Sequence, residues 1–248
     1  MLTPGIAERI DLVQTKVRAA CLRSGRASEE VRLMAVSKIH PAAAIAEAFA
    51  AGLRLFGENR VQEFQQKLPV LNESGIQTIG PDLSEKAADV HLIGHLQSNK
   101  AARAAEIFSS IDTIDSLRLV ERLDDAAGKA NRRLPILIEI KLSDESTKAG
   151  VEPESRELAD LLERLPDLPH IHMHGLMTVA PLDENPETAR TCFRRLRILR
   201  EQLAAQHAQL DFGELSMGMS GDFEIAIEEG STLVRIGTAI FGARPKPA

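Results

Sequence analysis

The stretch Arg32-Leu33-Met34-Ala35-Val36-Ser37-Lys38 is apolar through its middle and ends in a primary amine, three residues before Pro41. A short apolar run bounded by a turn signal is typical of a buried strand. A helical pattern follows at residues 42–51, and a second apolar run at residues 54–57 precedes Glu58-Asn59, after which a further helix is predicted through Leu68. This order of strand, helix and strand predicts parallel pairing, with Lys38 at the carboxyl end of a buried strand.

The same alternation continues to the carboxyl terminus. We predict a leading helix at residues 4–23 and further strands, separated by helices, at residues 90–94, 111–114, 135–142, 171–179, 214–217 and 233–236. Eight strands separated by helices favour an α/β fold, a single-domain (β/α)8 TIM barrel that covers residues 1–248. An open doubly wound sheet is the alternative, but its Gly-rich dinucleotide motif is missing after the first strand. Residues 72–86 lack a clear period and are interpreted as a surface loop or insertion.

The bulk composition narrows the class of protein. Hydrophobic residues make up 44% of the chain, enough for a full core, and 30 basic against 36 acidic residues give a net charge of -6. This balance disfavours nucleic acid or an acidic membrane surface as the main partner. Cys21 and Cys192 form no spacing motif, and no uninterrupted apolar stretch suits a signal peptide or a membrane span. We therefore expect a cytoplasmic protein with buried thiols.

In a barrel of this type, the active site lies at the carboxyl ends of the strands. Lys38, Asn59, His95, Ser216 and Gly237 all lie at such ends. A neutral lysine is a nucleophile, and a pocket of low dielectric constant favours the neutral form. A single lysine that reaches from a strand end to solvent is the commoner case, so the assignment depends on the residues around it.

Two segments near the carboxyl terminus suit a phosphate. Ser220-Gly221-Asp222 opens a short helix at residues 222–229, which Ser220 can cap while exposed amides face an anion. Gly237 and Thr238 end the last strand and permit close approach of the backbone. Loops after the seventh and eighth strands of such barrels often bind phosphate, although each segment alone is also ordinary turn chemistry. An amine that forms an imine beside a phosphate site points to pyridoxal 5'-phosphate (PLP).

Two further patterns have competing interpretations. An arginine at position 235 that faced the pyridine nitrogen of PLP would keep that nitrogen unprotonated and weaken the ring as an electron sink. A structural ion pair is the other role open to Arg235. His170, His172 and His174 alternate on the sixth strand and share a face, a spacing that can suit a metal. Without a CxxC or HExxH motif, structural histidines are favoured and we expect no metal site.

Several longer segments together match a known family over nearly the whole chain. They are AVSK at 35–38, FGENRVQE at 56–63, HLIGHLQSNK at 91–100, ESTKAG at 145–150, GLMT at 175–178, LSMGMS at 215–220 and VRIGTAIFG at 234–242. On these segments the chain resembles the PLP homeostasis proteins, also called the YggS/PROSC family. It departs from that pattern at Lys141, where such proteins commonly carry Asn.

The resemblance implies a fold similar to the N-terminal barrel domain of alanine racemase, without the second domain. It also implies that Lys38 holds PLP as an internal aldimine and that Arg235 lies near the pyridine nitrogen. The phosphate-binding and pocket-lining segments would supply the other site residues, Ser216, Ser220, Gly237, Thr238, Asn59 and Met177. The family is associated with intracellular vitamin B6 balance and with no established turnover. We therefore expect a non-catalytic protein that buffers or releases PLP.

Other functions are weighed against this one. A PLP-dependent amino-acid racemase needs an acid or base on each face of its substrate, and in the alanine racemase type one of the two is a tyrosine from the second domain. This chain contains no tyrosine. A barrel enzyme that acts on a phosphorylated sugar would leave Lys38 without a covalent cofactor. Expected partners are PLP and apo forms of PLP-dependent enzymes, and the expected state is a monomer or a weak dimer.

Overall fold

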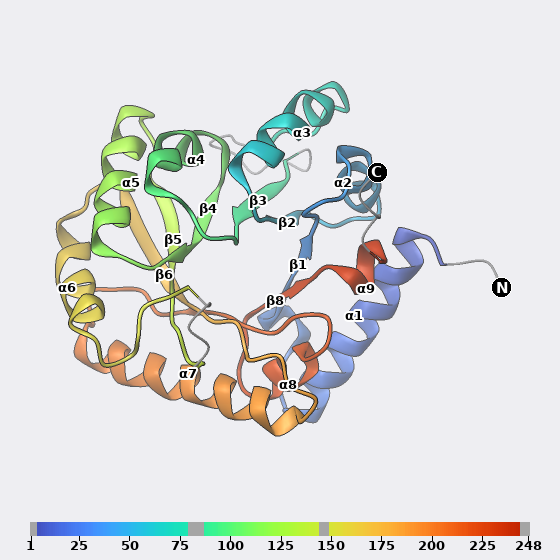
Figure 1. The fold of residues 1–248 in the computed structure, drawn as a ribbon. Helices are drawn as coiled ribbons and strands as arrows, with labels where there is room; N and C mark the ends of the chain where they lie inside the picture. The colour runs from blue at the N-terminus through green and yellow to red at the C-terminus, as the bar shows by residue number, and fades with distance from the viewer. Residues whose placement is uncertain (1–3, 79–86, 144–148, 244–248) are drawn as a thin grey trace.

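Eight parallel strands pair in chain order and the last returns to the first, which closes the sheet into a barrel (Figure 1). The computed structural model describes residues 4–78, 87–143 and 149–243. The strands are β1 Arg32–Val36, β2 Leu55–Glu58, β3 Asp89–Leu92, β4 Ser110–Ile114, β5 Leu134–Glu139, β6 Ile171–Met177, β7 Glu214–Ser216 and β8 Leu233–Ile236. All neighbouring pairs are parallel, so the eight strands end at one rim. The predicted (β/α)8 barrel is confirmed.

Helices surround the barrel on the outside (Figure 1). They are α1 Ile6–Arg23, α2 Ala42–Ala50, α3 Val61–Glu73, α4 Ala101–Ile107, α5 Leu117–Lys129, α6 Arg156–Arg164, α7 Pro186–Gln206, α8 Phe223–Glu228 and α9 Thr238–Phe241. Short 3-10 turns lie at Ser28–Glu30, Ser98–Lys100 and Leu165–Asp167. The leading helix α1 packs beside α8 and α9, next to the place where β8 meets β1.

Local sequence signals account for the ends of several helices. The stripe of Ile6, Ile10, Val13 and Val17 is buried in α1, as its spacing of three and four residues predicts. Gly25 follows α1 with a φ of 69°, the left-handed conformation that glycine adopts most easily after a helix. At the start of α7, the Asn185 side chain accepts a hydrogen bond from the amide of Glu187.

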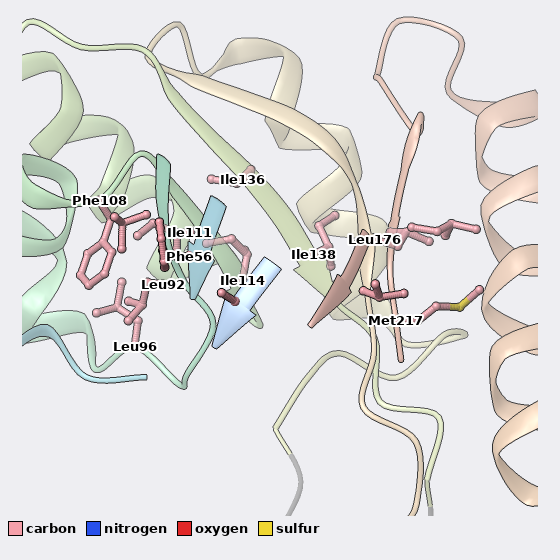
Figure 2. Close-up of a cluster of buried hydrophobic side chains, with 14 of the residues drawn as sticks. Phe56, Leu92, Leu96, Phe108, Ile111, Ile114, Ile136, Ile138, Leu176 and Met217 are labelled. Atoms are coloured by element: carbon pink, nitrogen blue, oxygen red, sulfur yellow. The ribbon is translucent and has the colours of Figure 1, made fainter. Parts of the chain in front are cut away.

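The main core lies between the sheet and the helices. Figure 2 shows Phe56, Leu92 and Ile111, from β2, β3 and β4, gathered beside Phe108 at the end of α4. All four side chains are at most 1% exposed. A second, small apolar cluster comprises Met34, Leu55 and Leu233. Successive residues of a strand face opposite sides of a sheet, so the residues adjacent to the outer core positions point into the barrel.

The barrel interior buries charge as well as apolar groups. His91 alternates with the outward-facing Val90 and Leu92, and its Nδ1 atom lies 2.9 Å from Oδ2 of Asp112. Its Nε2 atom lies 3.4 Å from Oδ1 of Asp89. Burial alone would lower the pKa of His91, but the two carboxylates outweigh it and raise that pKa to about 10. His91 is therefore a cation at neutral pH.

Two predicted element ends were wrong near the site. The first strand ends at Val36, and Lys38 lies in the turn that follows, because Ile39 has a φ of 62° and cannot continue a strand. The helix after the second strand runs through Pro69 to Glu73, although we predicted its end at residue 68. Pro69 lies on the exposed face, while Leu71 continues the buried stripe, so packing of the last turn outweighs the missing amide.

Other differences are smaller. The fifth strand ends at Glu139 rather than residue 142, and the sixth at Met177 rather than residue 179. Of the predicted loop at residues 72–86, the first two residues belong to α3, Gln77 forms an isolated bridge with Ala87, and residues 79–86 lie outside the described residues.

The three histidines of the sixth strand do not form one group. His172 and His174 approach each other to 3.0 Å. His170 precedes β6, and its ring lies over Gly128 of α5. The described residues contain no group of three or more His, Cys, Asp or Glu side chains arranged for a metal ion.

Cys21 and Cys192 are both buried, as predicted. Within the described parts of the chain, no helix combines the length and apolar character needed to cross a bilayer.

Candidate cofactor site at the carboxyl ends of the strands

The register of β1 and β8 brings two distant segments of the sequence together. Ala35 pairs with Ile236, so the residues that follow each strand leave the barrel side by side. A Cβ atom built on Gly237 would lie 3.4 Å from the carbonyl oxygen of Val36. The turn that carries Lys38 therefore borders the Gly237-Thr238 segment, as a shared site requires.

The predicted site residues lie at the ends of five consecutive strands. Met177 ends β6, Ser216 ends β7, Arg235 and Gly237 lie at the end of β8, Lys38 follows β1 and Asn59 follows β2. Met177 is 1% exposed and pairs in register with Ser216. These residues form a continuous arc of the rim, although more than 170 residues of sequence separate Asn59 from Gly237.

Arg235 is the fixed charge of this arc. Its side chain is buried, Nη1 donates to Oγ of Ser216 at 2.7 Å, and Nη2 donates to the carbonyl oxygen of Thr178 at 2.8 Å. Thr178 in turn donates its hydroxyl to the carbonyl oxygen of Ile140 at 2.7 Å. The guanidinium group is thus held by neutral oxygens at 2.7–2.8 Å. Two roles were suggested for Arg235, a place near the pyridine nitrogen and a structural ion pair. These contacts are hydrogen bonds to neutral oxygens, so they do not form the suggested ion pair.

The two segments predicted to bind phosphate also contact each other. The amide of Ala239, in the first turn of α9, donates to Oγ of Ser220 at 3.4 Å. Gly218 has a φ of 95°, and a Cβ there would lie 2.5 Å from the Cβ of Ala226, so glycine is required for this turn. Thr238 is exposed at the rim.

The predicted capping role of Ser220 was wrong. Helix α8 begins at Phe223 with Asp222 as its cap residue, and the Asp222 carboxylate accepts from the amide of Met219 at 2.5 Å. The chain turns between Met219 and Asp222, which directs Ser220 toward α9 instead of toward the start of α8.

One polar atom in the arc lacks a partner. The Oδ1 atom of Asn59 is buried and has no hydrogen-bond partner among the described residues. Buried polar groups are rarely left unpaired, so each one calls for an explanation such as a bound group. The Asn59 backbone lies against Gly94, where a Cβ would come within 2.3 Å of the Asn59 carbonyl oxygen. This close packing fixes where Asn59 lies relative to the end of β3.

Glu139 is a charged residue of this rim that the sequence analysis did not select. It ends β5 and is 8% exposed. Burial raises the pKa of its carboxyl group to about 7, although the Arg235 cation acts in the opposite direction. A single acidic residue at the end of the apolar run Leu134–Glu139 was the signal that could have identified it.

Two rim residues lie away from the arc. The His95 side chain is 59% exposed and its Nδ1 atom lies 3.1 Å from Oδ2 of Asp115. The Nζ atom of Lys141 lies 3.9 Å from Oε1 of Glu152, at the margin of an ion pair. Lys141 borders a cleft that is also lined by Ser155, the cap residue of α6, and by Arg195 of α7.

Comparison with known proteins places this geometry in context. Residues 10–245 match the family model described as alanine racemase, N-terminal domain. The chain is 41% identical over 239 residues to the pyridoxal phosphate homeostasis protein of Escherichia coli (strain K12), which covers 96% of this chain and 97% of that one.

Solved structures that resemble this chain include one of high and one of low sequence identity. The structure of PipY of Synechococcus elongatus PCC7942 with PLP bound aligns with a TM-score of 0.77 at 42% identity, over 96% of this chain and 100% of that one. An alanine racemase of Clostridium difficile 630 aligns with a TM-score of 0.68 at 14% identity, over 96% of this chain and 58% of that one. The second alignment reflects the shared barrel alone.

Proposed function

The chain belongs to the alanine racemase N-terminal domain family and to its pyridoxal phosphate homeostasis proteins, and on that premise we propose that it binds PLP and buffers or releases it. The observation that carries the proposal is the register of β1 with β8, which sets the Lys38 turn beside Gly237 and Thr238. A PLP carrier and a PLP-dependent racemase both use such an amine beside a phosphate site, whereas an enzyme acting on a phosphorylated sugar would leave Lys38 without a covalent cofactor.

The residues of the arc fit the cofactor. Backbone amides at Ser220-Gly221 and Gly237-Thr238, with the hydroxyl of Ser216, would hold the phosphate. Arg235 would lie by the pyridine nitrogen, where its fixed guanidinium group disfavours protonation of the ring. Asn59 offers a buried acceptor that lacks a partner, and Met177 offers an apolar wall. PLP itself supplies an aldehyde that bonds reversibly to primary amines.

Lys38 would hold the cofactor reversibly. Its neutral Nζ atom would condense with the aldehyde that PLP supplies, with loss of water. Water would reverse the condensation and free the cofactor, so capture and release would need no reagent besides water, as expected of a reservoir.

We propose further that the protein does not turn over amino acids at enzymatic rates. A racemase of the alanine racemase type needs a second base, and the chain contains no tyrosine. A positioned base contributes about 10²–10⁴-fold in rate. An unprotonated pyridine nitrogen would weaken the electron sink as well.

The proposal extends to the setting of the protein. We assign residues 1–248 to a single PLP-binding domain, in the cytoplasm, as a monomer or weak dimer. Apo forms of PLP-dependent enzymes would receive the cofactor. The family membership supports this setting, and the buried cysteines are consistent with a reducing compartment.

Mapping the modified lysine tests the binding site. Protein loaded with PLP is reduced with borohydride, which makes the C=N bond permanent, and its peptides are sequenced. We expect the label on Lys38 and its loss in Lys38→Ala. A wild-type label on another lysine would contradict the assignment.

Deuterium exchange separates the carrier from a racemase. The loaded protein is incubated with L-alanine in deuterated water, and α-deuteration and racemisation are followed over time. We expect neither above the rate of free PLP. Turnover at enzymatic rates that Lys38→Ala abolishes would favour the racemase instead.

A further inference from the structure

Three charged side chains, two of them buried, contact the turn that carries Lys38. Lys67 of α3 is 7% exposed, and its Nζ atom donates to Oε1 of Glu58 at 2.7 Å and to Oε1 of Glu63 at 2.9 Å. Glu58 ends β2 and is fully buried. We call Glu58, Glu63 and Lys67 the clamp.

The clamp bonds to the backbone on both sides of Lys38. Lys67 Nζ donates to the carbonyl oxygen of Ser37 at 3.1 Å, and the Ser37 hydroxyl donates to Oε1 of Glu58 at 2.6 Å. On the other side, the amide of Ile39 donates to Oε1 of Glu63 at 2.5 Å. Each peptide that flanks Lys38 therefore has a charged partner.

The backbone between these bonds is in an unfavourable conformation. Ile39 has a φ of 62°, in the left-handed region that β-branched residues rarely occupy. Such a conformation persists only where the surroundings determine it, and it is most common at functional sites. The Ile39 side chain is 45% exposed, so packing of that side chain does not account for the conformation.

Stability alone is a weak explanation for the clamp. Burial raises the pKa of Glu58 against the opposing effect of Lys67, which shows that the carboxylate loses solvation here. A buried ion pair is often no more stabilising than apolar residues of the same volume. What these contacts determine is the conformation of the turn at residues 37–39.

We propose that the clamp positions Lys38, so that its amine meets the aldehyde carbon of PLP without a search among turn conformations. The three residues are positioning residues, since they act through the backbone of the turn. This inference rests on the proposed function, in which Lys38 bonds to PLP. A group held in the reactive geometry reacts faster and binds more tightly than one that must first be ordered.

Glu63 is the member best suited to a test, because its side chain is 22% exposed and its loss leaves the core intact. Two ligands are compared: PLP, and pyridoxine 5'-phosphate, which carries an alcohol in place of the aldehyde and cannot bond to an amine. For Glu63→Ala we expect about tenfold weaker binding and slower covalent capture of PLP, the scale of one lost charge-assisted hydrogen bond. Binding of pyridoxine 5'-phosphate should stay within about twofold.

Two variants serve as controls. Glu63→Gln keeps an oxygen that can accept from the Ile39 amide, so it should recover most of the PLP affinity. Glu157→Ala removes a comparable carboxylate bond, from the Leu117 amide at the start of α5, and should leave both ligands unaffected. Should Glu63→Ala fail to fold, Ser37→Ala removes only the hydroxyl bond to Glu58 and is tested in the same way.

The outcomes are distinct. Weaker PLP binding with unchanged pyridoxine 5'-phosphate binding supports the clamp. Equal loss of both ligands assigns these residues a purely structural role and overturns it, as does an unchanged PLP affinity. If the borohydride label in the wild-type protein is not on Lys38, the proposed function fails first and the clamp fails with it.

Discussion

Arg235 shows how far a single residue can be assigned from its place in a strand. Residues two apart on a strand face the same side, so Arg235 shares the face of Gly237. The sequence left its role open between the pyridine nitrogen of PLP and a structural ion pair. The structure shows that Arg235 is buried, with Ser216 and Thr178 as its partners. Those partners come from strands β7 and the end of β6, and only the closed sheet brings them together.

Gly237 gives a prediction at this scale. A Cβ at this position would make only ordinary contacts within the protein, the nearest at 3.4 Å from the Val36 carbonyl oxygen. Gly237→Val should therefore fold normally while its methyl groups obstruct the phosphate. We expect PLP binding to weaken by about tenfold or more, since a phosphate that loses backbone amides loses charge-assisted hydrogen bonds.

Pyridoxal, which lacks the phosphate, is the control ligand. Its affinity for Gly237→Val should change by no more than about twofold, and the melting temperature should match that of the wild type. Titrations with both ligands measure the difference. Equal weakening of PLP and pyridoxal would show that Gly237 does not lie at the anion site.

Other residues of the site were missed for a physical reason. Glu139 ends an apolar run, and Glu63 and Lys67 have the i,i+4 spacing of a helical ion pair. Charged residues most often lie in solvent, so neither pattern indicates burial at a site. Their importance comes from burial and from contacts between elements, such as the bond of Lys67 to Ser37. A sequence pattern shows which face a residue occupies but not which distant group faces it.

Strand β6 illustrates the same limit at the scale of an element. Its register with β5 shifts between Ile136 and Leu137, and Gly175 then pairs with Glu214 of β7. A Cβ on Gly175 would lie 1.9 Å from the Glu214 carbonyl oxygen, and the φ of Gly175 is 154°. The apolar run predicted a strand here, but the irregularity that directs Met177 toward Ser216 had no recognisable signal.

Replacement of this glycine should weaken the sheet. We expect Gly175→Ala to lower the free energy of unfolding by about 2–4 kcal/mol, from the clash with β7 and from backbone strain. Gly52→Ala is the matched control, because Gly52 also has a positive φ, 98°, but no atom lies within 4 Å of its Cβ position. Urea denaturation of the two variants isolates the clash, and equal losses would contradict it.

Helix α3 shows which element boundaries the sequence could not supply. A proline usually ends a helix, and the predicted end at residue 68 lay directly before Pro69. The observed helix continues because Leu71 is fully buried, a contact that depends on the neighbouring elements. Boundaries thus depended on tertiary packing, whereas the existence and order of the eight strands followed from local periodicity alone.

At the scale of the whole molecule, the barrel carries the candidate site at one rim and buries charged side chains in its interior. Alternation of strand and helix predicted closure, because eight parallel strands with outer helices favour a barrel. The charged interior was not predicted, since His91 lies between Val90 and Leu92, and Asp112 between Ile111 and Thr113, as polar residues do in a half-exposed strand. In the structure both are buried, and Ser110 donates to the second oxygen of Asp112 at 2.6 Å.

The last prediction separates stability from binding. The pKa of His91 is raised from its ordinary value of 6.5 to about 10, so its contribution to stability is complete below pH 6.5 and is lost as the pH rises toward 10. His91→Gln leaves Asp112 buried without a cationic partner. We expect it to lower the free energy of unfolding by about 3–5 kcal/mol near pH 6, and by much less near pH 10.

Urea denaturation of wild type and variant across this pH range measures the effect. PLP affinity at neutral pH should fall far less than stability, because Arg235 is held by Ser216 and Thr178 and not by His91. A variant that remained folded but lost PLP binding would show that the interior charges set the position of Arg235. A difference in stability that stayed constant from pH 6 to pH 10 would instead show that His91 is uncharged in the folded barrel and bonds to Asp112 as a neutral donor.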